Sequence, residues 1–256
     1  MLSLPPEVQL DVLKCLNFEQ LFYLKQTNFY FLNLIEKYEG GLARMEFFEL
    51  SLIAAKTIDS QEMDSSVTVK LEPIVYSELI SNDQIMEKWE TALAKSIPLF
   101  LHGGFEVYFE NYMEDFAVQL QKTDDKNSSY ILKLPNIPQT IEEMIIIRFC
   151  LEQLSYCAVE FAYFESVIFN PEIINLLFDQ TILQFHIKTA AIDIKNDKFE
   201  IFLNFGLNHF AIYKIFAFVH YNISVQYTDI LFNIIINERQ KISSTLSWGF
   251  QVYNNL

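Results

Sequence analysis

The feature that most constrains the fold is a series of short strand-like segments, separated by helix-like ones, in the C-terminal three quarters of the chain. The segments are residues 67–71, 99–101, 130–134, 159–161, 183–187, 215–219 and 246–248. Their starts lie 32, 31, 29, 24, 32 and 31 residues apart, and a near-regular spacing of this size is typical of repeated strand–helix units. The alternation predicts a parallel sheet with right-handed crossovers.

Two architectures fit this alternation. One is a curved array similar to a leucine-rich repeat, with the strands on its concave side, although the regular leucine–asparagine signature is missing. The other is an ordinary α/β sandwich. Helix starts are predicted where a capping residue or a proline precedes an apolar run. They are Thr140 with Glu143, Asn170-Pro171, and Asn196 or Asp197, with a further helix over 227–235.

The N-terminal residues follow a different, helical pattern. Apolar residues at 8, 12, 13 and 16 lie on one helical face, and Pro5 and Pro6 suit a helix start because first-turn N–H groups have no intrahelical acceptor. Asn17 and Asn28 can cap a second and a third helix. Three short helices in about 40 residues bury a limited fraction of their surface. Some of their large apolar side chains must therefore face another protein or the next domain.

These N-terminal residues resemble the F-box. Leu4-Pro5-x-Glu7-Val8, Val12, Leu16, Leu21, Leu24, Thr27, Phe29 and Leu34-Ile35 follow its pattern in order and spacing, whereas Asn28-Phe29-Tyr30 stands where many members carry a basic residue and a Trp. The resemblance implies a helical module that binds a Skp-type adaptor and, through it, a cullin scaffold. By matching position, it assigns the adaptor contact to Leu4, Pro5, Val8, Val12, Leu16 and Leu24.

The expected fold class is α+α/β, with a three-helix F-box over 1–45, a helical linker and loop over 46–66, and an α/β substrate-recruitment region over 67–256. Residues through 56 look helical, and the polar stretch 59–66 reads as a loop. The sequences at 169–178, 183–187 and 226–238 also resemble the region after the F-box in an expanded set of F-box proteins from plant-parasitic nematodes.

The resemblance implies a substrate receptor of a Skp–cullin–F-box ubiquitin ligase, a non-catalytic subunit that binds a target protein through its α/β region. The sequence does not identify the target. Two alternatives stay open. One is an interaction scaffold with no ligase link, whose helices pack only internally. The other is an α/β hydrolase or transferase, which requires a polar pocket that gathers histidines near Cys150 or a carboxylate.

Charge and cysteine content narrow the partners and the compartment. The 33 acidic and 18 basic residues give a net charge of −15, which repels phosphate backbones and anionic membrane surfaces, so neither nucleic acid nor a membrane is expected as partner. Polar residues also divide the apolar stretch 205–223 into pieces too short for a bilayer span. Three cysteines without framework spacing, and no secretory signal pattern, predict the cytoplasm or the nucleus.

Candidate catalytic and metal-binding residues are few, and each has a simpler interpretation. Cys150 and Cys157 lie among large apolar residues and are expected to be buried, inert thiols. His186, His209 and His220 lack zinc-site spacing. His102-Gly103-Gly104 reads as a turn, and the pairs Asp124-Asp125 and Glu142-Glu143 as solvated charges. No cofactor, metal site or catalytic residue is predicted.

Overall fold

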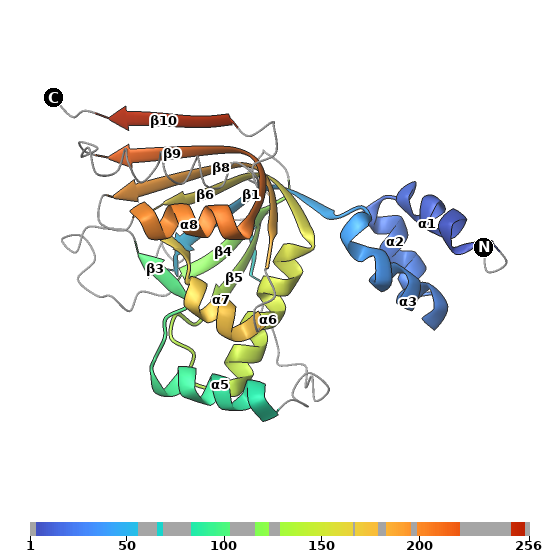
Figure 1. Cartoon of the computed structure of the whole chain (residues 1–256), viewed down its shortest axis with the longest axis horizontal. Coiled ribbons are helices and arrows are strands. Elements are labelled where there is room, and N and C mark those ends of the chain that lie inside the picture. Colours follow the sequence, from blue (N-terminus) through green and yellow to red (C-terminus); the bar gives the residue numbers. More distant parts are fainter. Residues whose placement is uncertain are drawn as a thin grey trace.

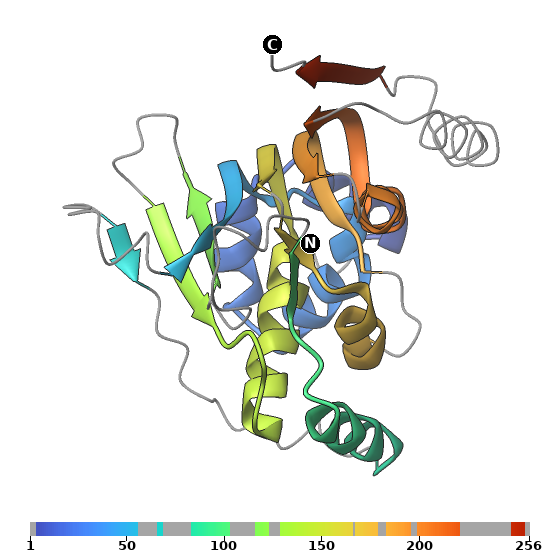
Figure 2. The ribbon, with the colours of Figure 1, turned by 90° about the vertical axis from the view of Figure 1, so that its left-hand side faces the viewer.

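The computed structural model describes residues 4–55, 66–68, 83–102, 116–122, 129–165, 167–178, 183–195, 199–220 and 247–253. These residues form a helical module, defined here as residues 4–42, and a larger α/β region that begins with strand β1 (Met45–Ala54). In Figure 1 the helical module stands to one side of the α/β region, and β1 leads from one to the other. Figure 2, seen from the opposite end, places the module behind the sheet.

Three helices and a turn of 3-10 helix build the helical module: α1 (Pro6–Lys14), α2 (Phe18–Lys25), α3 (Phe29–Tyr38) and η1 (Glu39–Gly41). Asn17 forms a capping box, in which its Oδ1 accepts from the Gln20 N–H at 2.9 Å and its own N–H donates to Gln20 Oε1 at 3.0 Å. The Asn28 side chain accepts from the Phe31 N–H at 3.1 Å. The predicted three-helix N-terminal part is confirmed, together with its helix starts.

The core of the helical module is small. Leu13, Leu21, Ile35 and Leu42 are buried in it. Five half-buried residues pack around them: Leu10, Leu16, Leu24, Leu34 and Tyr38. Lys25 ties α2 to the end of α3 and to η1, with its Nζ 3.2 Å from Glu39 Oε1 and 3.9 Å from Glu36 Oε1.

A sheet of eight described strands, in the order β10-β9-β8-β6-β1-β4-β5-β2, forms the centre of the α/β region. Besides β1, its strands are β2 (Ser66–Thr68), β4 (Phe116–Gln121), β5 (Ser129–Leu134), β6 (Cys157–Glu165), β8 (Phe185–Lys195), β9 (Phe210–His220) and β10 (Ser247–Tyr253). Neighbouring strands from β1 through β6, β8 and β9 to β10 run parallel, and β2 is parallel to β5. β4, however, is antiparallel to both β1 and β5.

The sheet is therefore mixed, and the prediction of a wholly parallel sheet is wrong for β4 and β5. Only residues 122–128 connect these two strands, too few for the crossover that a parallel connection requires. The predicted strand at 99–101 lies in a separate pair, β3 (Phe100–His102) antiparallel to β7 (Val167–Phe169). A mixed α/β fold is thus established, whereas repeated strand–helix units stay a prediction.

The prediction of a helical linker after residue 45 is also wrong, because these residues form β1. This strand lies inside the sheet, between β4 and β6. Phe47, Leu50, Ser51 and Leu52 are all buried. Buried and more exposed residues therefore do not alternate strictly along the strand. A strand covered on both faces loses the period of two that distinguishes it from a helix. The α/β region thus begins at residue 45 and not at 67.

Three helices lie on one face of the sheet, α6 (Ile141–Ser155), α7 (Pro171–Phe178) and α8 (Phe199–His209), and α5 (Asp83–Ala94) packs farther out against α6 and α7 (Figure 1). The predicted starts of α6 and α7 are confirmed. Thr140 Oγ1 accepts from the Glu143 N–H at 3.2 Å, and Asn170 Oδ1 accepts from the Glu172 N–H at 3.0 Å. The predicted helix over 227–235 lies outside the described residues.

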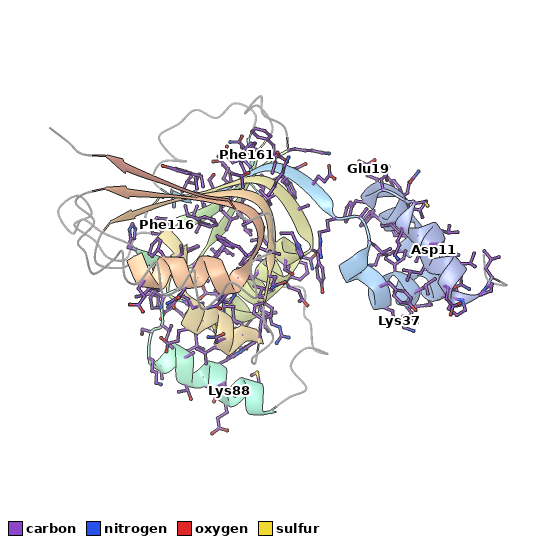
Figure 3. The ribbon with its side chains drawn as sticks, turned by 45° about the horizontal axis from the view of Figure 1, so that its top comes forward. Asp11, Glu19, Lys37, Lys88, Phe116 and Phe161 are labelled. Carbon is purple, nitrogen blue, oxygen red and sulfur yellow. The ribbon has the colours of Figure 1, made fainter. Side chains whose placement is uncertain are left out.

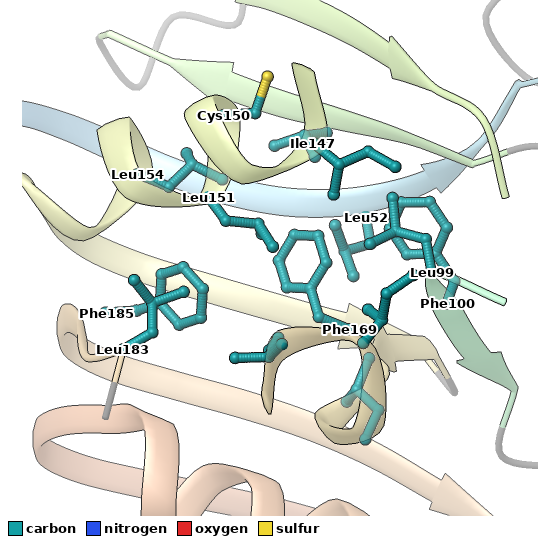
Figure 4. Packing of buried hydrophobic residues seen from close by; sticks show 14 of the residues in the cluster. Leu52, Leu99, Phe100, Ile147, Cys150, Leu151, Leu154, Phe169, Leu183 and Phe185 are labelled. Atoms are coloured by element: carbon teal, nitrogen blue, oxygen red, sulfur yellow. The ribbon is translucent and has the colours of Figure 1, made fainter. Parts of the chain in front are cut away.

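One large apolar core fills the space between this face and the helices. Figure 4 shows side chains from β1, β3, α6 and β7 meeting in it, including Leu52, Phe100, Leu151 and Phe169. The Trp89 ring of α5 is also buried in this core, and its Nε1–H donates to the Leu176 carbonyl of α7 at 3.2 Å. The core therefore extends outward past α7.

Three adjacent strands change the phase of their alternation at the same level of the sheet. The core-facing residues are Phe47 and then Leu50 on β1, Val159 and then Ala162 on β6, and Ile187 and then Ala190 on β8. Each pair is three residues apart instead of two. Two adjacent residues between each pair, such as Glu160 and Phe161, therefore lie toward the face away from the helices, called the outer face below. Strands of the sheet are curved in Figure 1.

Candidate protein-interaction surface

An exposed apolar row runs along α1 and the residues before it. Val8 and Val12 are four residues apart, which places them on one side of α1, and Leu4 comes directly before the Pro5 N-cap of the helix. The exposed fractions of Leu4, Val8 and Val12 are 39%, 42% and 37%, although large aliphatic side chains are usually buried. We call these three side chains the α1 row. Leu13, on the other side of α1, is fully buried in the module core. The prediction that residues 8, 12, 13 and 16 share one helical face is therefore wrong for Leu13, because adjacent helical residues point about 100° apart.

The start of the α1 row is held in place by Gln9. Its side chain is nearly completely buried, with 4% exposed. The Gln9 Nε2 donates to the Leu4 carbonyl at 2.7 Å, and the Tyr30 hydroxyl of α3 donates to Gln9 Oε1. A buried amide bonded on both sides is costly to break. Gln9 therefore fixes the Leu4-Pro5 end against α3.

The six residues assigned to the adaptor contact divide into two sets. Leu4, Pro5, Val8 and Val12 are exposed. Leu16 and Leu24 are half-buried and pack against the core of the helical module. Leu16 and Leu24 therefore support the fold of the module in addition to any contact with a partner.

Four aromatic residues of the helical module are also exposed, and the sequence analysis assigned none of them to the adaptor contact. Phe22, Tyr23, Phe29 and Tyr30 have exposed fractions of 48%, 67%, 81% and 40%. The rings of Phe22 and Tyr23 meet edge to face, with centroids 5.9 Å apart. Three short helices were expected to leave some large apolar side chains facing another protein or the next domain, and these four rings are exposed in the structure. What they face stays a prediction. That surplus of large apolar side chains was a signal in the sequence that could have found these rings.

Charged residues border the α1 row. Glu7 and Asp11 are exposed on α1 and follow each other at the same interval of four as Val8 and Val12. Figure 3 shows Asp11 with Glu19 and Lys37 on the surface of the helical module. Cys15, three residues after Val12, is exposed as well. The row is thus an apolar strip with a charged edge, which is the usual composition of a protein-interaction surface.

The two cysteines of the α/β region are buried, as predicted. Burial raises the pKa of the Cys150 thiol to about 12 and that of Cys157 to about 11. The Cys157 Sγ also donates to the Gln153 carbonyl at 3.3 Å. A thiol needs a lowered pKa to act as a nucleophile or a metal ligand near neutral pH. Both thiols stay protonated there.

The histidines occupy separate places. His102 packs its ring 4.8 Å from that of Phe116, and His186 is half-buried on β8, where burial lowers its pKa. His209 is buried at the end of α8, with Nδ1 3.0 Å from the Leu183 carbonyl oxygen. Burial lowers its pKa too. Among the described residues, no group of three or more His, Cys, Asp and Glu side chains could hold a metal ion.

Other candidate positions are settled only in part. The hydrogen bonds of its own backbone N–H and of Thr140 lower the pKa of Glu142, which is exposed at the start of α6. Gly103, Gly104, Asp124 and Asp125 lie outside the described residues, as does the side chain of His220. In the part of the chain that the structure describes, no helix has the length and apolar character needed to cross a membrane.

A family described as Domain of unknown function (DUF8381) matches residues 69–221, which is more than half of the chain. The match lies within the α/β region, and no F-box family matches the chain. No curated protein and no solved structure matches it either.

Proposed function

We propose that this chain, which belongs to the DUF8381 family, is the substrate-receptor subunit of a Skp–cullin–F-box ubiquitin ligase. In this proposal the helical module binds a Skp-type adaptor, and through it the cullin, while the α/β region binds a target protein. The chain itself contributes no catalysis and no cofactor, and it works in the cytoplasm, the nucleus or both. The α1 row is the observation that carries the proposal.

Two features of the α1 row favour a role in binding a partner: its exposure and the hydrogen-bonded glutamine that holds its start. Its three side chains stay exposed beside a core that consists of only four buried residues. An apolar row whose start is held by a buried, hydrogen-bonded glutamine suits a preorganised interface, which loses little entropy when the partner binds. The resemblance of these residues to the F-box names the class of partner. The four exposed aromatic rings add large side chains of the type enriched at interfaces.

The separation of the two parts also supports an adaptor role. The helical module stands beside the α/β region, and α1 lies away from the sheet in Figure 1. A receptor has to hold the ligase and the target at once, which raises the effective concentration of target lysines near the ubiquitin-loaded enzyme. Because the helical module and the α/β region have separate cores, one can offer a surface for the ligase and the other a surface for the target.

A scaffold without a ligase link is the competing proposal. Helices that pack only internally would bury Pro5, Val8 and Leu24 tightly. Pro5 and Val8 are exposed and Leu24 is half-buried, which favours the adaptor role. A hydrolase or transferase would need an activated nucleophile, and protonated buried thiols at Cys150 and Cys157 give that alternative no support.

Adaptor binding by matched variants tests the proposal. The Leu4→Asp, Val8→Asp double variant replaces two members of the α1 row with charges. Val8 is the third residue of α1, where an aspartate suits the helix dipole, so the module should still fold. Ile201→Asp is the matched control, since Ile201 is the third residue of α8 and has a similar exposed fraction of 43%.

Wild type and Ile201→Asp should bind a purified Skp-type adaptor equally, and the double variant should bind about 100-fold more weakly, given the cost of losing central interface contacts. Circular dichroism checks that each variant is folded. Equal binding by all three proteins, or binding by none, would sink the proposal.

Alkylation of Cys15 provides an independent measurement. Cys15 is exposed beside the α1 row, while the other two thiols are buried and protonated, so the native chain should react at Cys15 alone. The adaptor should slow this reaction several-fold by covering the thiol. Unchanged reactivity at a saturating adaptor concentration would contradict a contact at the α1 row.

A further inference from the structure

The outer face of the sheet carries exposed aromatic side chains. Phe161 and Tyr163 of β6 have exposed fractions of 40% and 39%, and the Phe48 ring of β1 meets that of Phe161 edge to face with centroids 5.3 Å apart. We call these three residues the outer aromatic patch. In Figure 3, Phe161 lies on the side of the sheet opposite the helices.

The phase change in the sheet is what places these rings outward. Val159 and Ala162 face the core with two residues between them, so Phe161 turns away from the core and Tyr163 follows on the same side. A strict alternation from Val159 would have pointed Phe161 inward. The change of phase in β6 is therefore next to the exposed rings of Phe161 and Tyr163.

Carboxylates surround the outer aromatic patch. Glu49 is the partner of Phe161 across the β1–β6 pair, and Glu46 is exposed nearer the start of β1. Glu160 adjoins the patch as well, with its Oε1 2.5 Å from Lys188 Nζ on β8. Lys188 therefore offsets one of the three negative charges. Among the described residues, Glu46 and Glu49 take part in no ion pair.

We propose that the outer aromatic patch and Glu49 bind an arginine-bearing segment of the target protein. That this segment belongs to a ubiquitination target rests on the proposed function, whereas its recognition by the patch does not. A guanidinium group can stack on an aromatic face and pair with a neighbouring carboxylate through two parallel hydrogen bonds. Phe161 and Glu49, side by side in register, present these two groups together.

The charges around the patch separate this partner from others. Glu46 and Glu49 repel the phosphates of nucleic acids and of anionic lipids, whereas they attract a cationic peptide. Arginine suits the site better than lysine, because the ammonium group lacks the planar face and the paired donors. The partner is therefore a protein segment that combines arginine with apolar side chains.

Labelled synthetic peptides test this inference on the full chain. Three short peptides would be identical except at alternate positions, which carry arginine, lysine or glutamine, and fluorescence anisotropy would give each dissociation constant. The arginine peptide should bind about tenfold more tightly than the glutamine peptide, with lysine between them. Added salt should reduce this preference.

Four variants locate the binding site. Phe161→Ser with Tyr163→Ser should weaken binding of the arginine peptide about tenfold, and Phe161→Leu with Tyr163→Leu, which keeps apolar area without ring faces, should remove the preference for arginine over glutamine. Glu49→Gln should weaken binding several-fold and flatten the salt dependence. Ile201→Ser, at a similarly exposed apolar residue outside the patch, should bind like wild type.

Three results would overturn the inference. They are no binding of any peptide by the wild type, equal affinity for arginine and glutamine peptides, and equal losses in the patch variants and in Ile201→Ser. Thermal unfolding of every variant separates a lost site from a lost fold. Adaptor binding keeps the two proposals distinct, since the patch variants should retain it. Arginine-peptide binding by a chain that binds no adaptor would leave the patch standing and remove the ligase role.

Discussion

The helical module and the α/β region differ in how much of their apolar surface the chain itself covers. The module buries four apolar residues in its core and leaves seven large hydrophobic residues exposed, from Leu4 to Tyr30. The much longer α/β region exposes three among its described residues, Phe161, Tyr163 and Ile201. Surface area falls relative to volume as a domain grows. Size alone, however, does not explain why the three exposed aliphatic residues, Leu4, Val8 and Val12, all belong to α1 and the residues just before it.

In the helical module, the residues that pack in the core and the residues proposed to bind a partner lie on opposite sides of one helix. Leu13 packs inward, whereas Val8 and Val12 face outward. In the α/β region, the separation is between the two faces of a sheet. The helices cover one face, and the outer aromatic patch lies on the other. Both regions thus separate packed side chains from exposed ones, the helical module across a helix and the α/β region across a sheet.

Truncating a core leucine in each region should give the largest effects and distinguish the two cores. Leu13→Ala and Leu151→Ala each remove a fully buried side chain, which costs about 2–5 kcal/mol in the free energy of unfolding. Leu13→Ala should open the helical module alone, because its core is separate from the large one. Hydrogen exchange would then accelerate in α1 to α3 and stay slow in α6.

Leu151→Ala should instead accelerate exchange throughout the α/β region. Similar acceleration in α6 by both variants would show that the two regions unfold as one cooperative unit, and the comparison between separate cores would fail.

Arg44 connects the two regions, and its removal should have the next largest effect. Its Nη1 donates to the Ser155 carbonyl at the end of α6 at 3.0 Å, and its Nη2 donates to the Gly40 carbonyl at 3.3 Å. Hydrogen bonds from a charged group contribute about 1.5–3 kcal/mol when shielded from water, and half-buried Arg44 should lie at the lower end.

Arg44→Ala should therefore lower the free energy of unfolding modestly and let the helical module tumble more independently in NMR relaxation. Arg44→Lys cannot reach two carbonyls with one planar group, so both measurements should lie between those of the wild type and of Arg44→Ala. The exposed Lys14 provides the control, and Lys14→Ala should change neither measurement. Unchanged relaxation in Arg44→Ala would mean that other contacts fix the module.

Local signals made the helical module predictable from its sequence. Asn17 and Asn28 cap their helices through hydrogen bonds that span three residues, so the neighbouring sequence contains the whole interaction. The resemblance to the F-box assigned the exposed α1 row to the adaptor contact, but it also assigned Leu16 and Leu24, which are half-buried. Gln9 was missed because its partners, the Leu4 carbonyl and the distant Tyr30, come together only when α3 packs on α1.

The α/β region was less predictable, because its strands are defined by their neighbours. β1 reads as a helix because both of its faces are partly covered. Strict alternation also fails where the core-facing residues of β1, β6 and β8 shift phase together. Each strand on its own shows only an irregular pattern, so the shared position of the shift, and with it the outward placement of Phe161, requires the sheet.

Buried histidines of the α/β region should make the free energy of unfolding depend on pH. We expect this effect to be smaller than the effect of removing Arg44. Burial lowers the pKa of His209 below its ordinary value of 6.5. The folded state thus disfavours the charged imidazole, so His209 contributes stability above about pH 6.5 that is lost as pH falls through its folded pKa. His186 acts in the same direction.

His209→Gln keeps a donor for the Leu183 carbonyl and removes the titration. Its free energy of unfolding should therefore fall less steeply than that of the wild type between pH 7 and pH 5, measured by denaturant titration at each pH. Equal slopes in both proteins would show that His209 takes up no proton on unfolding in this range.

The smallest effect on stability is expected where the largest effect on binding is proposed. Val8→Ser removes an apolar side chain that is already 42% exposed, and valine and serine have similar helix propensities. The free energy of unfolding should therefore change by less than about 0.5 kcal/mol, whereas Leu13→Ala on the inner side of the same helix should cost several times more. Denaturant titration of both variants measures the contrast. A loss of more than about 1 kcal/mol in Val8→Ser would mean that Val8 supports the module core, and the α1 row would then be part of the fold and no longer a surface kept for a partner.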